Sequence, residues 1–275
     1  MTNYEQRITI FIDILGFRNI VKKTELDEEL TNKIFNVLNS MKSEILSSEL
    51  FGEINIDNEN EEFEEVKKLR DLLSKSLKDK SSIQISHFSD SIVFSIGLEN
   101  DMNAMSLIEY IGRITYRLWK DFRILIRGGV SIDKLIHTEN GVLFGPAMVK
   151  AYDYETNLAN YPRIVFDDLS YNVFRNSSSF KAMQKLIKPF SDKKEIKGKI
   201  VEIKKGFEIN LGTSILHLLE SHFTFHPERR KEVFNILKNV DIELNDLKAQ
   251  TDNEDIKEKY QYLINEFNQI EFPKI

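Results

Sequence analysis

The chain has 275 residues, of which 41% are hydrophobic and 30% are charged, so it can fill a real core beneath an ordinary polar surface. With 38 basic and 44 acidic side chains its net charge is −6, which argues against a general affinity for nucleic acid or for anionic lipid. The sequence contains no cysteine, so disulfide and thiolate chemistry are excluded. The longest apolar stretch, Ile8 to Phe17, is interrupted by Asp13 and is too short to span a bilayer. We therefore expect a cytoplasmic protein with no membrane contact.

The first predicted element is a strand over residues 7–13, where β-branched and aromatic residues alternate. This strand ends on Asp13, shortly before a tight turn at Gly16. Apolar residues then recur at helical spacing from Leu30 to Ile45, which predicts a long amphipathic helix. A dense acidic run follows, and we predict a helical insertion at about residues 52–80 with no chemistry of its own.

The middle of the chain predicts an alternation of strands and helices. Residues 83–86 and 91–97 are typical of two strands around a polar tip that contains Asp90. Apolar spacing then predicts a helix near residues 107–118, a strand over 123–132, a helix over 145–159 and a strand over 162–166. Mixed hairpins and crossovers predict an α+β fold with a ferredoxin-like core, its helices lying on one face of a mainly antiparallel sheet.

The last third of the sequence changes from strand to helix. Residues 199–211 alternate on either side of Lys205 and Gly206, which predicts a hairpin that closes the core domain. Residues 233–240 and 260–267 then mark two amphipathic helices that could pack on the core or on a second subunit. We therefore divide the chain into a core domain, residues 1–211, and a C-terminal helical extension, residues 212–275.

Two aspartates lie in apolar, strand-like settings where an unpaired carboxylate is costly to bury. Asp13 ends the first strand, and Asp90 lies in the polar tip between two later strands. Two carboxylates from adjacent strands are the minimum set for holding two divalent ions for phosphoryl chemistry. Taken singly, Asp13 could instead cap the following turn, and Asp90 could be an ordinary turn residue.

The residues around these aspartates resemble a known family, the class III nucleotide cyclases. The family's F-x-D-x-x-G-F motif, which ends the first strand of its catalytic domain, is matched in register by Phe11, Asp13, Gly16 and Phe17. The second metal-binding aspartate of the family lies at a hairpin tip, and Asp90 occupies that place. An R-x-G-[IV] strand and a later helix of the family are matched by Arg127, Gly129, Val130, Gly145, Ala147, Ala151 and Glu155. The resemblance covers roughly residues 7–211.

This resemblance implies a two-metal reaction on a nucleoside triphosphate. Two Mg²⁺ or Mn²⁺ ions per active site would be held by Asp13, Ile14 and Asp90. Backbone amides from Leu15 to Phe17, around Gly16, would cradle the substrate phosphates. The family builds its active site between two subunits, so the resemblance also implies a homodimer.

Several family positions are altered in this chain. Val149 and Asp153 stand where the family places an asparagine and an arginine that act in the transition state. Ser86 replaces the lysine that usually selects purines, and Val142 stands where adenylate cyclases often keep an aspartate. Base recognition is therefore not that of an ordinary purine cyclase, and the residues expected to contact the base are Ser86 and Phe88.

Charge that builds on the α-phosphate still needs a cation, because phosphoryl transfer depends on positioned positive groups. The candidates are Arg127, Lys150 and Arg163, each of which could instead pair with a nearby acid. We place Arg127 first, because the two glycines that follow it would let a substrate approach closely.

With these positions altered, the chain looks like the bacterial pyrimidine cyclases of the Pycsar antiphage systems. This implies that UTP or CTP is converted to a cyclic monophosphate, and that a downstream effector senses this product without binding the cyclase. The residues do not distinguish uridine from cytidine. The alternatives are a degenerate cyclase fold that only binds a nucleotide or a protein, and a purine nucleotide cyclase. A polymerase-palm or diguanylate-cyclase relative would share the core, but the chain has no GGDEF-like hairpin.

Overall fold

The computed structural model describes residues 3–40, 83–98, 101–177, 180, 184–196, 199–225 and 230–271. The predicted acidic insertion lies outside these residues. The strands are β1 (Glu5–Ile14), β2 (Gln84–Phe88), β3 (Ser91–Gly97), β4 (Ile126–His137), β5 (Leu143–Phe144), β6 (Arg163–Phe166), β7 (Lys188–Ile196) and β8 (Lys199–Asn210). The helices are α1 (Phe17–Thr24), α2 (Glu28–Ser40), α5 (Asp101–Phe122), α6 (Pro146–Leu158), α7 (Asp168–Arg175), α9 (Leu211–Phe225), α10 (Arg230–Ala249) and α11 (Glu254–Asn268).

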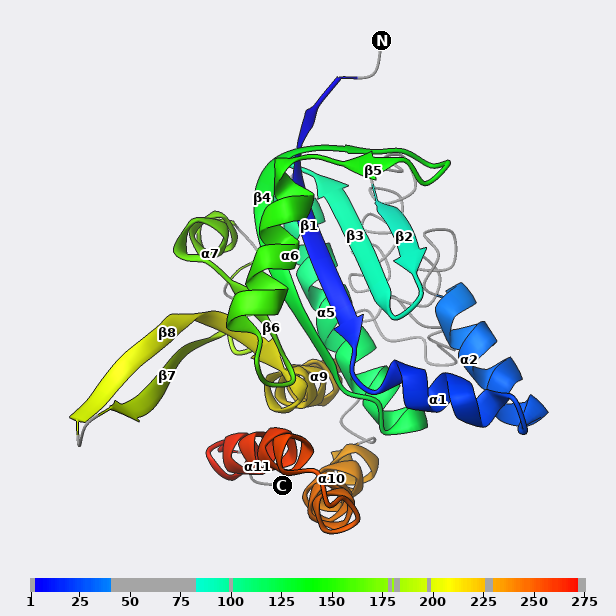
Figure 1. The fold of residues 1–275 in the computed structure, drawn as a ribbon. Helices are drawn as coiled ribbons and strands as arrows, with labels where there is room; N and C mark the ends of the chain where they lie inside the picture. The colour runs from blue at the N-terminus through cyan, green and yellow to red at the C-terminus, as the bar shows by residue number, and fades with distance from the viewer. Residues whose placement is uncertain are drawn as a thin grey trace, which may run out of the picture.

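The sheet is built around β1, which lies inside the strand order β2-β3-β1-β4-β6-β8-β7 (Figure 1). β1 pairs antiparallel with both β3 and β4, and β2 pairs antiparallel with β3. The order β4-β1-β3-β2 is that of a ferredoxin-like core, so the predicted α+β class and core are confirmed. β6 then adds parallel to β4, and β8 and β7 follow as an antiparallel pair.

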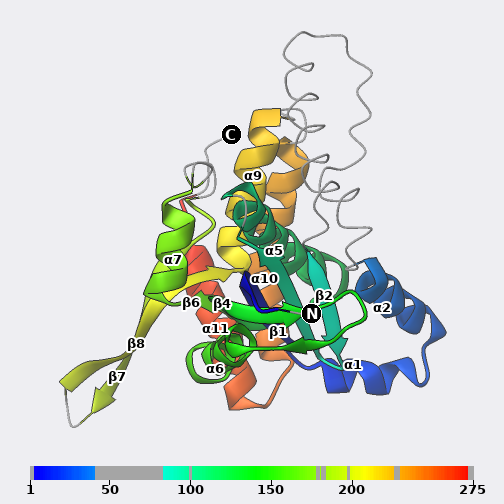
Figure 2. The same cartoon turned by 90° about the horizontal axis from the view of Figure 1, so that it is seen from above.

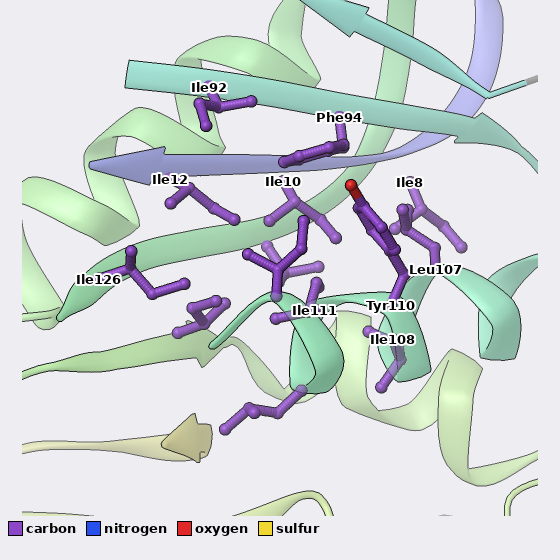
Figure 3. Packing of buried hydrophobic residues seen from close by; sticks show 14 of the residues in the cluster. Ile8, Ile10, Ile12, Ile92, Phe94, Leu107, Ile108, Tyr110, Ile111 and Ile126 are labelled. Atoms are coloured by element: carbon purple, nitrogen blue, oxygen red, sulfur yellow. The ribbon is translucent and has the colours of Figure 1, made fainter. Parts of the chain in front are cut away.

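The two faces of β1 meet different helices because successive side chains of a strand point to opposite sides. Ile8, Ile10 and Ile12 are fully buried on the side of α5, where the main hydrophobic core lies (Figure 3). Phe11 points the other way and packs against Ala151 of α6. Helices therefore cover both faces (Figure 2), and the predicted one-faced arrangement is wrong. The parallel pair β4 and β6 needs a crossover, and α6 makes this crossover on the face opposite α5.

The close approach of α6 to β4 depends on Gly129. A Cβ atom at this position would lie 2.1 Å from the carbonyl oxygen of Ala151. A Cβ atom at Gly128 would lie 2.4 Å from the carbonyl oxygen of Phe11 on β1. The space beside both glycines is therefore filled by other parts of the protein. The prediction that they leave room for a substrate beside Arg127 is wrong, because α6 and β1 fill that space.

The predicted hairpin at Lys205 and Gly206 is also wrong. Both residues lie within β8, whose antiparallel partner is the preceding strand β7. A Cβ atom at Gly206 would lie 2.8 Å from the carbonyl oxygen of Phe166 on β6. The glycine thus serves close strand packing, which a sequence pattern does not distinguish from a turn.

The C-terminal helices pack on the core. The two helices predicted over residues 233–240 and 260–267 are confirmed as parts of α10 and α11. A second hydrophobic cluster joins them to α5 and to the residues before β4; its buried members are Trp119, Leu125, Leu211, Ile215, Val240, Leu244, Leu263, Ile264 and Phe267. The boundary proposed at residues 211 and 212 stays a prediction. No helix in the described part of the chain is long and apolar enough to cross a membrane.

Substitution of Gly129 tests the helix–sheet contact. Gly129→Ala should lower the free energy of unfolding by roughly 3 kcal/mol, because its methyl group would meet backbone atoms that cannot move aside. Gly112→Ala in α5 is the matched control, since its methyl group would meet only the end of the Leu186 side chain at 3.0 Å. Alanine also favours the helix there by about 1 kcal/mol. Urea unfolding of both variants measures the difference, and equal losses would contradict this account of Gly129.

Candidate active site

Asp13 and Asp90 meet at one end of the sheet. Asp13 is the penultimate residue of β1 and pairs with Ser91, the residue that follows Asp90. The backbone N–H of Ile14 donates to the carbonyl oxygen of Asp90 at 2.9 Å, which ties the β2–β3 turn to the end of β1. β2 ends at Phe88 and β3 begins at Ser91, so Asp90 lies in a two-residue turn, as predicted.

The oxygens at this point fit a hard divalent cation. The Asp90 carboxylate has no side-chain hydrogen bond to any residue that the structure describes, and the Asp13 side chain is one-fifth exposed. Ile14 can add only its backbone carbonyl. Among the described residues no group of three or more His, Cys, Asp or Glu side chains could hold a metal ion. Mg²⁺ typically binds one or two protein carboxylates and completes its shell with phosphate and water oxygens, so two aspartates suit an ion that arrives with a nucleotide.

Arg127 lies between two carboxylates. It is the direct partner of Asp13 across the β1–β4 pair, and its Nε–H donates to Asp13 Oδ2 at 2.9 Å. The same Nε atom lies 2.8 Å from Oε1 of Glu155 on α6. Nε carries one hydrogen, and that hydrogen points to Asp13. The buried Glu155 Oε1 is therefore left with the charge of Arg127 but without a hydrogen bond.

Glu155 is nearly inaccessible to solvent, with 3% of its surface exposed. Burial raises the pKa of the Glu155 carboxyl, and the Arg127 guanidinium opposes this shift. The two terminal nitrogens of Arg127, Nη1 and Nη2, have no partner among the described residues. The side chain is thus held at Nε, while its outer end offers four N–H groups to a ligand.

The glycine turn after β1 begins a helix. Gly16 has φ of 76° and precedes α1, which has no side-chain cap at its N-terminus. The first N–H groups of a helix have no acceptor within the helix, so those of Phe17 and its neighbours can bind an anion. The N–H of Leu15, however, donates to the carbonyl oxygen of Leu125 at 2.9 Å. Leu15 therefore cannot offer its amide to a phosphate, and the predicted cradle narrows to Gly16 and Phe17.

The two residues expected to contact the base differ in exposure. Phe88 is half exposed, whereas Ser86 is buried and its hydroxyl lies 2.9 Å from Nε2 of His137. Nδ1 of the same ring lies 2.8 Å from the hydroxyl of Ser95, which accepts a hydrogen bond from Arg7. The sequence prediction missed this network because it ended the strand at residue 132, whereas β4 continues to His137.

The three candidate cations lie in different surroundings. Lys150 forms an ion pair with Asp133, on the part of β4 remote from Asp13. Arg163 is wholly buried, and its guanidinium donates to Asp192 and Glu208. Of the three, only Arg127 contacts Asp13.

Several solved structures are similar to this chain. They include the adenylyl cyclase CyaB from P. aeruginosa, at 14% sequence identity and a TM-score of 0.43, with 76% of this chain and 95% of that chain covered. The guanylate cyclase domain of RhGC from Catenaria anguillulae in complex with GTP is 15% identical, with a TM-score of 0.41 over 76% of this chain and 98% of that chain. The catalytic core of a rhodopsin-guanylyl cyclase with converted specificity, in complex with ATPαS, is 15% identical, with a TM-score of 0.43 over 76% and 97%. No protein-family model and no curated protein matches the sequence. At these identities and TM-scores the likeness carries no argument about function, so the residues of the site have to carry it.

The buried His137 predicts a pH dependence of stability. Burial, with a smaller effect of the Arg7 charge, lowers the pKa of His137 from 6.5 to about 4. Between these values the unfolded chain binds a proton at His137 that the folded protein does not, so stability falls as the pH drops through this window. We expect wild type to lose about 2 kcal/mol from this group between pH 7 and pH 5. In His137→Asn that loss should disappear from urea unfolding curves, whereas in His87→Asn, which removes an exposed histidine, it should remain. Parallel profiles for wild type and His137→Asn would contradict the assignment.

Proposed function

We propose that the protein is a nucleotide cyclase that converts UTP or CTP to its 3′,5′-cyclic monophosphate and pyrophosphate. The observation that supports this most is the convergence of Asp13 and Asp90 at the end of β1, beside the open N-terminus of α1. Two carboxylates near a helix N-terminus suit a ligand made of a metal ion and a polyphosphate. A module that bound only an anion would have no need of carboxylates there.

In the proposed reaction the ribose 3′-oxygen attacks the α-phosphorus, and the bond from that phosphorus to the bridging oxygen of the β-phosphate breaks. The 3′-hydroxyl proton passes to water, and pyrophosphate leaves. Asp13, Asp90 and the backbone carbonyl of Ile14 would hold Mg²⁺ or Mn²⁺, two ions per active site. When bound, these ions supply positive charge that lowers the pKa of the hydroxyl and stabilises the triphosphate.

The remaining roles fall to groups that have free hydrogen-bond donors. The amides of Gly16 and Phe17 would hold the terminal phosphates. Nη1 and Nη2 of Arg127 would stabilise charge on the α-phosphate, since these nitrogens have no partner in the described part of the chain. Lys150 pairs with Asp133 on the part of β4 remote from Asp13, and Arg163 is wholly buried, so we assign both to structure and not to the reaction.

The pyrimidine preference rests on the resemblance. A serine, Ser86, replaces the lysine that selects purines in the family, and Phe88 offers a half-exposed ring two residues further along β2. By strand alternation both side chains lie on the face of the sheet that α6 covers, the face of Asp13. A second candidate, a cyclase fold that binds without turnover, is favoured by the loss of the helix asparagine and arginine, where Val149 and Asp153 stand.

A homodimer would cover exposed apolar residues on α6 and on the strands that flank it. Val149 and Tyr152 of α6 are 60% and 49% exposed. Phe144 of β5 is half exposed as well, and so is Phe88 of β2. Contiguous exposed apolar surface marks an interface more often than single exposed residues do. We also propose that the product is an antiphage signal of the Pycsar type, made in the cytoplasm and sensed by a separate effector.

The activity is tested with purified protein, Mn²⁺ and each of the four nucleoside triphosphates in turn, with products resolved by mass. We expect cyclic UMP or cyclic CMP, and loss of nearly all product in Asp13→Ala and Asp90→Ala. Lys150→Ala is the control and should keep its activity. Metal-dependent nucleotide binding without any cyclic product would favour the binding module, and a cyclic purine product would overturn the pyrimidine preference.

The dimer is tested by light scattering after gel filtration. Val149→Lys places a charge in the apolar surface on α6 and should shift the protein to monomers and lower cyclase activity at least tenfold. Ile242→Lys is the matched control, because this residue is 58% exposed on a helix away from the site. It should leave both the mass and the activity unchanged. A wild-type monomer at micromolar concentration with full activity would contradict the proposal.

A further inference from the structure

The cluster of Asp13, Arg127 and Glu155 contains two carboxylates and only one Nε hydrogen to share between them. Asp13 Oδ2 receives that hydrogen at 2.9 Å. Glu155 Oε1 lies just as close, at 2.8 Å from Nε, and remains a buried acceptor without a hydrogen bond. Leaving a buried acceptor unpaired is unfavourable, so Glu155 competes with Asp13 for the Nε hydrogen of Arg127.

The two carboxylates differ in what else can reach them. The Asp13 side chain is 20% exposed, whereas the Glu155 side chain is 4% exposed and has α6 and β4 around it. A metal ion from solvent can therefore reach Asp13 but not Glu155. An ion that binds Asp13 competes with Arg127 for the same oxygens, since both are cations.

We infer that Glu155 is a positioning residue that takes over the Nε–H of Arg127 when a metal ion binds Asp13. This inference rests on the metal site of the proposed function. In the metal-free protein the charge of Arg127 neutralises the Asp13 carboxylate and fixes its orientation. With metal on Asp13, the bond from Nε passes to Glu155, and Arg127 stays at the site with Nη1 and Nη2 turned to the substrate. Without Glu155, Arg127 would have Asp13 as its sole carboxylate and would compete more strongly with the ion.

The transfer of this hydrogen bond to Glu155 depends on the close contact between α6 and β4. Gly129 allows the backbone of α6 to lie directly on the strand, where a Cβ atom would be 2.8 Å from the amide nitrogen of Glu155. Arg127 lies two residues before Gly129 on the same face, within reach of the Glu155 carboxylate. Any larger residue at position 129 would push Glu155 away from Nε.

The test measures binding of Mn²⁺ alone, without nucleotide, from the electron paramagnetic resonance signal of the free ion. Glu155→Gln should weaken Mn²⁺ binding several-fold, because Arg127 then pairs with Asp13 alone. The double variant Arg127→Gln with Glu155→Gln should bind Mn²⁺ about tenfold more tightly than wild type, since the competing cation is gone. It leaves no buried charge without its partner, so it should fold where Arg127→Gln alone does not. Lys150→Gln, which removes an exposed cation paired with Asp133, should leave the affinity unchanged.

A merely structural role for Glu155 would loosen the site in both variants, so Mn²⁺ affinity equal to or weaker than wild type in the double variant overturns the inference. Asp90→Asn separates this from a failure of the proposed function. Suppose that wild type binds Mn²⁺, that Asp90→Asn does not, and that the double variant shows no increase in Mn²⁺ affinity. Then only the inference about Glu155 is wrong. If wild type and Asp90→Asn bind Mn²⁺ equally, then the proposed metal site is wrong, and so is the inference that rests on it.

Discussion

The structure depends on the central place of β1. Its hydrogen bonds to β3 on one side and to β4 on the other fix which residues stand beside Asp13. One neighbour is Ser91, which brings the turn with Asp90 to the same end of the sheet. The other is Arg127, which brings a cation. A slip of one residue in either pairing would turn Asp13 toward the isoleucine core on the α5 face, where its neighbours would be mainly apolar.

The two faces of the sheet carry different kinds of side chains. The α5 face carries the main core, where the isoleucines of β1 are buried among apolar residues of α5. The α6 face carries a smaller apolar cluster of Phe11, Val93 and Ala151, and other positions on it hold charged and hydroxyl groups. Hydrophobic burial on one face therefore supplies stability that allows the other face to carry carboxylates and a guanidinium at a cost.

The sequence predicts the parts of the site that belong to single strands and turns. Asp13 at a strand end and Asp90 at a hairpin tip follow from alternation and turn chemistry. Glu155 and His137 are different, because their partners come from elements far apart in the chain. A buried glutamate in a helix pattern and a histidine beyond the predicted end of a strand carry no local sign of the groups that they meet.

Glycine marks the limit of such prediction most clearly. Gly16, Gly129 and Gly206 look alike in the sequence, yet only Gly16 adopts a positive φ at a turn. The other two admit backbone from a neighbouring element. Whether a glycine turns the chain or receives another segment depends on tertiary packing, so both errors about the glycines beside Arg127 and Lys205 have one physical cause.

Two arginines on neighbouring strands show why burial decides which cation can meet a ligand. Arg127 precedes Gly128, and Arg163 precedes Ile164, the partner of Gly128 in the parallel pair. Arg163 is fully enclosed, and both of its terminal nitrogens bond to acceptors from β7, β8 or α6. Among the described residues, Arg127 is held at Nε alone. The same residue type at adjacent places is thus a structural cation where all sides are filled, and it is the cation that we propose for ligand binding where one side is open.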